Sequence, residues 1–252
     1  MQRSQLVNRL NELLKPHLVN DYCPNGLQVE GSENVSRIVT GVTASMALID
    51  QAITQDADTI LVHHGYFWKG ETPALVGMKQ KRIKKLLAHN INLFAYHLPI
   101  DIHPQLGNNV QLGKILGLHN IQAVNSISPI GIVMQGELSE AQSLSQICER
   151  VQSSLARKPM SIDAGEHLVK KLAWCTGGGQ NYIDQLVDQG IDAFLSGEIS
   201  EQTVHSAREQ NIHYISAGHH ATERYGVKAV GEWLASEYND LHVAFVDVEN
   251  PA

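Results

Sequence analysis

Five side chains of the types that bind divalent metals stand at short spacings or at the ends of predicted strands in this sequence. They are His63, His64, Asp101, His219 and Glu223. On a helix, residues four apart lie on one face, so His219 and Glu223 can aim an imidazole and a carboxylate at a common atom. The alternative explanation of that pair is a simple hydrogen bond on a helix face. The whole set offers nitrogen and oxygen donors and no thiolate, which favours zinc, manganese, iron, cobalt or nickel over calcium or magnesium.

The adjacent histidines raise a geometric question, because neighbouring side chains of an extended strand point to opposite faces. His63 and His64 can serve one site only where the strand breaks, which Gly65 allows, and more easily if two ions share the ligands. Five protein ligands suit a pair of divalent ions roughly 3.5–4 Å apart, with Glu223 as the bridging residue. Asp101 cannot cap the next predicted helix, because Pro104 and Gly107 separate it from that helix. A turn-forming role is therefore its remaining structural alternative.

The elements that position these residues alternate between strands and helices. The first half has predicted strands at residues 37–43, 59–64 and 91–97 and predicted helices at residues 45–55, 81–90 and 108–116. The second half has strands at residues 171–176, 193–196 and 212–217 and helices at residues 181–189 and 201–210. This order predicts βαβ units and a largely parallel sheet. The candidate ligands then follow strand ends, where sites form in open α/β sheets.

The two halves are related in sequence. An offset of 134 residues places Asp50 on Asp184, Asp58 on Asp192 and Leu61 on Leu195. We therefore expect an α/β protein of two similar lobes, produced by internal duplication, with largely parallel sheets. The predicted domains are residues 1–124 and 125–252, with a final strand at residues 241–248 that is able to return to the first lobe.

Other signals are weaker. A helical period of leucines at the N-terminus follows Ser4, which we interpret as the helix cap. The run Gly177–Gly179 lies between a predicted strand and a predicted helix, where it forms either a tight turn or an anion-binding site at the helix N-terminus. Tyr66, Phe67 and Trp68 follow the paired histidines and are expected to seal the wall of the site or to stack on a base.

Composition restricts the class of protein. Apolar residues make up 43% and charged residues 18% of the 252 residues, as in ordinary globular proteins. The formal charge of −7 argues against general binding to nucleic acid or anionic membranes. A basic cluster at residues 79–85 is interpreted as a solvated helix face. The three cysteines lack CxxC spacing, and no segment approaches the roughly 20 apolar residues of a membrane span. We expect a soluble cytoplasmic protein.

Four ordered blocks resemble the GTP cyclohydrolase 1 type 2 family, also called NIF-three-like, and especially its short bacterial YbgI-type members. They are Asn25–Val29, His63–Trp68, His97-x3-Asp101 with Gly107-x-Asn109-x2-Leu112, and Gly218-His219-x3-Glu223. Two positions depart from the family pattern. Gly65 replaces the usual proline, and Leu98-Pro99 replaces Thr-Asn after His97. The chain also lacks the middle domain of longer members.

The resemblance implies a dinuclear metal centre in the cleft between the two lobes, with two divalent ions per subunit. It also implies a ring-shaped homohexamer. It carries the ligand role to His63, His64, Asp101, His219 and Glu223. The expected function is a metal-dependent hydrolase of a nucleotide or related small molecule, acting at a ring carbon or a phosphoester. The alternative is a non-enzymatic metal-binding ring that serves as a scaffold or DNA-damage-associated factor. No catalytic residue is assigned from the sequence; His97 and Glu198 are candidates for orienting ligands or for catalysis.

Overall fold

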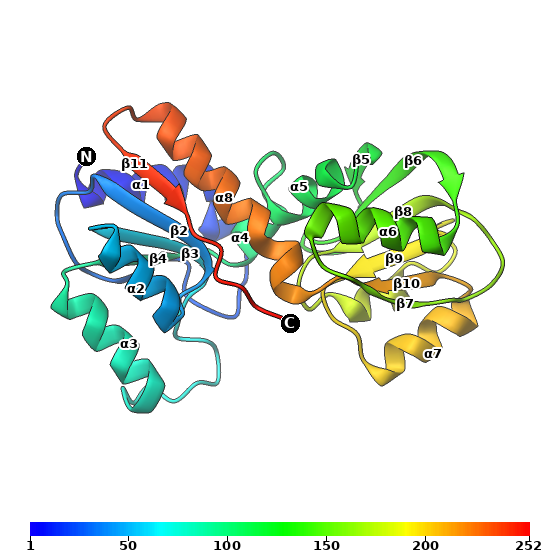
Figure 1. Cartoon of the computed structure of the whole chain (residues 1–252), viewed down its shortest axis with the longest axis horizontal. Helices are drawn as coiled ribbons and strands as arrows, with labels where there is room; N and C mark the ends of the chain where they lie inside the picture. Colours follow the sequence, from blue (N-terminus) through cyan, green and yellow to red (C-terminus); the bar gives the residue numbers. More distant parts are fainter. The chain divides into compact units, whose positions relative to one another are not determined.

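The computed structural model describes all 252 residues, and the chain forms two compact α/β units, each with its own sheet (Figure 1). Unit 1 contains Met1–Ile100 and Gly226–Glu249, and unit 2 contains Asp101–Tyr225 and Asn250–Ala252. The fold class agrees with the prediction from the sequence. No helix is both long enough and apolar enough to cross a membrane.

The unit boundaries differ from the predicted lobes of residues 1–124 and 125–252. Residues 101–124 belong to unit 2, because α5 (Asn108–Ile115) and β5 (His119–Ala123) pack on β6 (Met134–Gln142). Residues 226–249 belong to unit 1. Helix α8 (His219–Glu237) gives its residues up to Tyr225 to unit 2 and the remainder to unit 1.

The sheet of unit 1 has the strand order β1-β4-β3-β2-β11. Its strands are β1 (Gly26–Val29), β2 (Arg37–Thr43), β3 (Thr59–His64), β4 (Asn92–Ala95) and β11 (His242–Phe245). All neighbours are parallel except β1 and β4. Figure 1 shows β11, in red, beside β2, so the last strand of the chain joins the first sheet.

The helices of unit 1 are α1 (Arg3–Leu14), α2 (Met46–Thr54), α3 (Gly77–Ala88) and the later part of α8, with a short 3₁₀ turn at Pro16–Leu18. The core contains Ile60, Val62, Leu93, Leu48 and Leu86, all essentially buried. A central parallel strand is covered on both faces, which explains why β3 reads as a continuous apolar run before its two histidines.

The sheet of unit 2 has the order β5-β6-β8-β9-β10-β7. The strands not yet given are β7 (Met160–Ile162), β8 (Val169–Cys175), β9 (Ala193–Ser196) and β10 (His213–Ser216). Only β8, β9 and β10 are parallel neighbours; β5, β6 and β7 pair antiparallel. This sheet is therefore less parallel than predicted, because β5 and β6 are joined without the crossover helix that parallel strands require.

Helices α6 (Leu144–Leu155) and α7 (Glu201–Gln210) also belong to unit 2, and α7 matches its predicted range. Each begins at a serine, Ser143 or Ser200, whose hydroxyl accepts a hydrogen bond from the first turn. Trp174 is fully buried in the core, and its indole Nε1 donates to the carbonyl of Asn109 at 2.7 Å.

Three local expectations were wrong. Helix α1 begins after Gln2 rather than Ser4, because the Gln2 and Gln5 side chains form a reciprocal capping box. Helix α3 begins at Gly77, before the predicted start at residue 81. The predicted helix over residues 181–189 is a short 3₁₀ helix, Gln180–Gln185, followed by Asp188 and Gly190 at positive φ, which an α-helix does not tolerate.

Candidate metal centre

The paired histidines lie at the carboxyl end of β3, a central strand of the unit 1 sheet. His63 is fully buried and His64 is half-buried, and their ring centroids are 4.4 Å apart. The strand ends there at Gly65, where a Cβ would collide with Ala95 and with the Gln28 side chain. Glycine is therefore required for the close packing of this position against Ala95 and Gln28.

A third histidine, His97, joins this pair after the end of β4. Its ring centroid lies 5.0 Å from that of His63 and 5.7 Å from that of His64. Trp68 meets His97 edge-on, with centroids 4.9 Å apart and an interplanar angle of 87°. One ring nitrogen from each of the three histidines falls within 4.8 Å of the others, so the group can hold a metal ion. The sequence offered His97 only as a candidate for a supporting or catalytic role.

Protein oxygens fix all three rings at Nδ1. His63 Nδ1 lies 3.2 Å from the carbonyl of Tyr96, and His64 Nδ1 lies 3.2 Å from the Thr43 hydroxyl. His97 Nδ1 lies 2.7 Å from Asp21 Oδ1. Hydrogen bonds of this kind orient histidines that bind metals.

Asp21 was not anticipated from the sequence, because it lies 76 residues from His97 along the chain. Its side chain is only 3% exposed and also accepts hydrogen bonds from the Asn25 side chain and the Leu98 N–H, both at 2.9 Å. Burial raises the pKa of the Asp21 carboxyl, but the hydrogen bond and charge of His97, with the other donors, outweigh it. The pKa of Asp21 therefore lies below its ordinary value, and the carboxylate is ionised at neutral pH.

Unit 2 contains the remaining predicted ligands. Asp101 lies in the short helix α4 (Leu98–Ile102), not in an irregular turn, and is only 4% exposed. Its Oδ1 accepts from the Asn108 side chain at 2.9 Å and from the Thr176 hydroxyl at 3.3 Å. These donors hold one carboxylate oxygen in place.

His219 and Glu223 lie on the first turns of α8, as their spacing predicted. Nε2 of His219 is 3.1 Å from Glu223 Oε2, and Nδ1 of His219 is 2.7 Å from Glu198 Oε1. Burial lowers the pKa of His219, but the hydrogen bonds and charges of Glu223 and then Glu198 raise it to about 9. The imidazole is thus clasped by two carboxylates, one on α8 and one in the loop after β9.

The glycine run after β8 is explained by close packing. A Cβ on Gly177, which has a φ of +63°, would collide with Glu223 Oε1 and lie 3.1 Å from His219 Nε2. A Cβ on Gly179 would collide with the Cys175 side chain. Gly177 therefore gives Glu223 and His219 the room they occupy, and this account of the run needs no anion.

The aromatic residues after the paired histidines have different roles. Tyr66 is buried, its hydroxyl donates to the Ala44 carbonyl at 2.8 Å, and burial raises its pKa to about 12. Phe67 lies beneath the Lys79 ammonium, 4.8 Å from its ring centroid. Only Trp68 contacts the histidine group.

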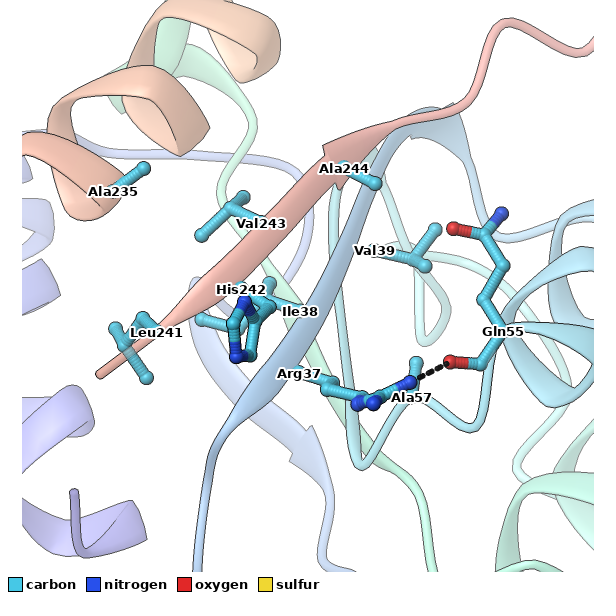
Figure 2. Close-up of a pocket in the computed structure, with 10 residues that line it drawn as sticks. All are labelled: Arg37, Ile38, Val39, Gln55, Ala57, Ala235, Leu241, His242, Val243 and Ala244. Carbon is cyan, nitrogen blue, oxygen red and sulfur yellow. Dashed lines mark hydrogen bonds between the residues drawn. The ribbon is translucent and has the colours of Figure 1, made fainter. Parts of the chain in front are cut away.

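A separate hollow of about 510 Å³ lies beside β11, at the opposite end of the unit 1 sheet from the histidines (Figure 2). Figure 2 shows Arg37 donating to the Gln55 carbonyl, at 3.3 Å, with His242 nearby on β11. None of the candidate metal ligands lines it, so the hollow and the candidate centre are distinct.

The donor set fits a divalent ion of the zinc, iron, cobalt or nickel type. Imidazoles in unit 1, and an imidazole with two carboxylates in unit 2, are nitrogen and oxygen donors of intermediate hardness. Three of their partners, Tyr96, Asn108 and Thr176, are buried and hold donor groups in fixed orientations. The fold and these groups define a two-unit α/β protein with candidate metal-ligand groups in each unit.

The chain belongs to the Duf34/NIF3 (NGG1p interacting factor 3) family, whose profile matches residues 1–251. A relative from Haemophilus influenzae, named "GTP cyclohydrolase 1 type 2 homolog", is 55% identical over the full length of both chains. One from Escherichia coli K12 with the same name is 51% identical, again over both full lengths.

Solved structures show the same fold. A structure described as "protein ybgI, unknown function" has a TM-score of 0.95 and 50% identity and covers 100% of both chains. A Thermus thermophilus protein has a TM-score of 0.90 and 31% identity, also over 100% of both chains. The sequence resemblance to short YbgI-type members is thereby confirmed.

Proposed function

We propose that this protein is a metal-dependent hydrolase of a nucleotide or related small molecule. Two divalent ions would be held by His63, His64, Asp101, His219 and Glu223. The observation that carries the proposal is the burial and hydrogen bonding of the candidate ligands. Their histidine rings and carboxylates are buried or half-buried and are already oriented by hydrogen bonds. Histidines that bind metals are held in fixed orientations by hydrogen bonds of this kind.

The residues of this chain have distinct tasks under the proposal. His63 and His64 bring neutral imidazoles from unit 1, and Asp101 and Glu223 bring negative charge from unit 2. Asn108 and Thr176 orient Asp101, while Glu198 orients His219. When bound, a pair of divalent ions supplies an activated water near neutral pH.

Two observations support a nucleotide as the substrate class: the names of relatives and an aromatic residue next to the histidines. Relatives at 51–55% identity carry the name "GTP cyclohydrolase 1 type 2 homolog", which describes those proteins. In this chain Trp68 is half-buried next to the histidines and offers an aromatic surface to a base. Tyr66 is excluded from stacking because it is buried in the core. We propose hydrolysis at a purine ring carbon or at a phosphoester.

The test begins with the protein purified with the metal it acquires in the cell, with elemental analysis of its content. Hydrolysis of purine and pyrimidine nucleotides is then measured before chelation, after chelation and after metal is restored. Activity that disappears and returns supports the hydrolase. Bound metal without turnover on any substrate of the panel would overturn it in favour of a non-enzymatic metal-binding scaffold.

A further inference from the structure

The three histidines of unit 1 share a feature that the five-ligand assignment does not use. Each has its Nδ1 engaged by an oxygen of the same unit: the Tyr96 carbonyl, the Thr43 hydroxyl or the Asp21 carboxylate. His97 has the shortest of these contacts, at 2.7 Å. It is therefore held at least as firmly as the two histidines that the sequence picked out.

The identity of the partner atoms determines which ring nitrogen carries the proton. A carbonyl oxygen and an ionised carboxylate can only accept a hydrogen bond, so Nδ1 donates in both His63 and His97. Nε2 is then the nitrogen whose lone pair is suited to coordinate a cation. The Thr43 hydroxyl can accept in the same way from His64. One nitrogen from each ring lies within 4.8 Å of the others, so the three rings can reach a common ion.

We propose that His97 is a third histidine ligand of unit 1, with Asp21 as the residue that positions it. This rests on the proposed metal centre and adds a sixth ligand to it. The complete set of proposed ligands would hold four imidazoles and two carboxylates. Three convergent imidazoles are a sufficient protein set for one ion that keeps an open coordination position.

Asp21 itself is unsuited to direct coordination. Its Oδ1 accepts from the Tyr22 N–H and from His97, and its Oδ2 accepts from Leu98 and Asn25. A metal bond would have to replace these hydrogen bonds. The neighbouring Cys23 is also unsuited, since burial, with the charge of Asp21, raises the pKa of its thiol to about 12.

The Asn25 side chain extends the same support to the backbone. Its amide nitrogen donates to Asp21 at 2.9 Å, and its amide oxygen accepts from the His97 N–H at 2.7 Å. Both the ring and the main chain of His97 are therefore fixed from the segment at residues 21–25. A surface or purely packing histidine does not require this arrangement.

The experiment measures metal binding without reference to turnover. Wild type, His97→Gln, His97→Ala, Asp21→Asn and the exposed control His89→Gln are stripped of metal and titrated with cobalt(II) against a chromophoric chelator. We expect both His97 variants to lose one tight cobalt ion. Asp21→Asn should weaken that ion by about 10- to 100-fold, the usual effect of removing a residue that orients a ligand. His89→Gln should match wild type.

Proton NMR of the cobalt-loaded protein gives a second readout on the wild type. A histidine that coordinates through Nε2 keeps its Nδ1 proton, which the cobalt shifts far from the normal range. One such signal should be absent from folded His97→Gln and present in His89→Gln.

The possible failures are distinct. The role of His97 would be overturned if the His97 variants still bound two cobalt ions with full affinity and kept all the shifted signals. That result would leave the proposed metal centre unaffected. A wild type that binds no cobalt would instead overturn the proposed function itself. If His97→Ala does not fold, His97→Gln and the wild-type spectrum still decide the question.

Discussion

Asp58 and Asp192 perform the same structural task in the two units. Each Oδ2 accepts hydrogen bonds from two consecutive N–H groups at the start of a neighbouring strand. The distances are 2.7 and 3.0 Å from residues 36 and 37, and 2.8 and 2.7 Å from residues 170 and 171. The backbone carbonyl of each aspartate also accepts from the first residue of another strand, Asn92 of β4 or His213 of β10. The offset of 134 residues that relates the two aspartates therefore also relates the N–H donors of their Oδ2 atoms, as the predicted duplication implies.

The first prediction concerns these aspartates. Asp58→Ala and Asp192→Ala should each lower the free energy of unfolding by about 1–3 kcal/mol, because charge-assisted hydrogen bonds at a strand start are lost. Thermal and urea unfolding measure the effect, with the exposed Asp240→Ala as the control. Stabilities within about 0.5 kcal/mol of wild type, the range of a neutral surface change, would contradict a shared structural role.

What the sequence could predict depended on how far apart the interacting residues are in the chain. The pairing of His219 with Glu223 follows from helical spacing alone, and the end of β3 follows from an apolar run that stops at two histidines. The support of His97 by Asp21 joins residues 76 apart, so no local pattern predicts it. The turn considered as the structural alternative at Asp101 is instead a short helix, because Pro99 can occupy the first turn of a helix, and here it does.

The second prediction concerns metal content. His219→Ala or Glu223→Ala should remove at least one ion per subunit and leave the fold intact, because both residues lie on the first turns of α8 and contact polar groups of the candidate site. Elemental analysis with circular dichroism measures both effects. His205→Ala, on α7, is the matched histidine control. Unchanged stoichiometry in both ligand variants would disprove the five-ligand assignment.

The third prediction concerns the pH dependence of the metal-free protein. Burial lowers the pKa of His219, but Glu223 and Glu198 outweigh it and raise the pKa from 6.5 to about 9. The protonated imidazole therefore stabilises the folded state. That stabilisation is complete below the unfolded pKa and is lost as pH rises through about 9. Glu198→Gln removes one carboxylate and should lower the His219 pKa. An NMR titration measures it, and an unshifted pKa in Glu198→Gln would exclude this electrostatic coupling.

The fourth prediction concerns assembly. We propose a homohexamer, as the family resemblance implies, in the closed symmetry usual for soluble oligomers. Light scattering coupled to gel filtration should return six times the chain mass of 27.8 kDa. The mass should hold as the protein is diluted over a tenfold range. A monomer at all concentrations would end this proposal without affecting the metal centre.

The last prediction concerns chemistry and separates the hydrolase from the scaffold. In Asp101→Asn the side chain keeps an oxygen that can accept from Asn108 and Thr176, but it loses the negative charge offered to a metal ion. With metal loaded, kcat for nucleotide hydrolysis should fall by about 10- to 100-fold. KM should change little, because the proposal places this carboxylate on the metal rather than on the substrate. Initial rates are compared with wild type and with the exposed Asp240→Asn. Equal kcat in Asp101→Asn and wild type would remove Asp101 from the reaction, and no turnover in any of the three would favour the scaffold.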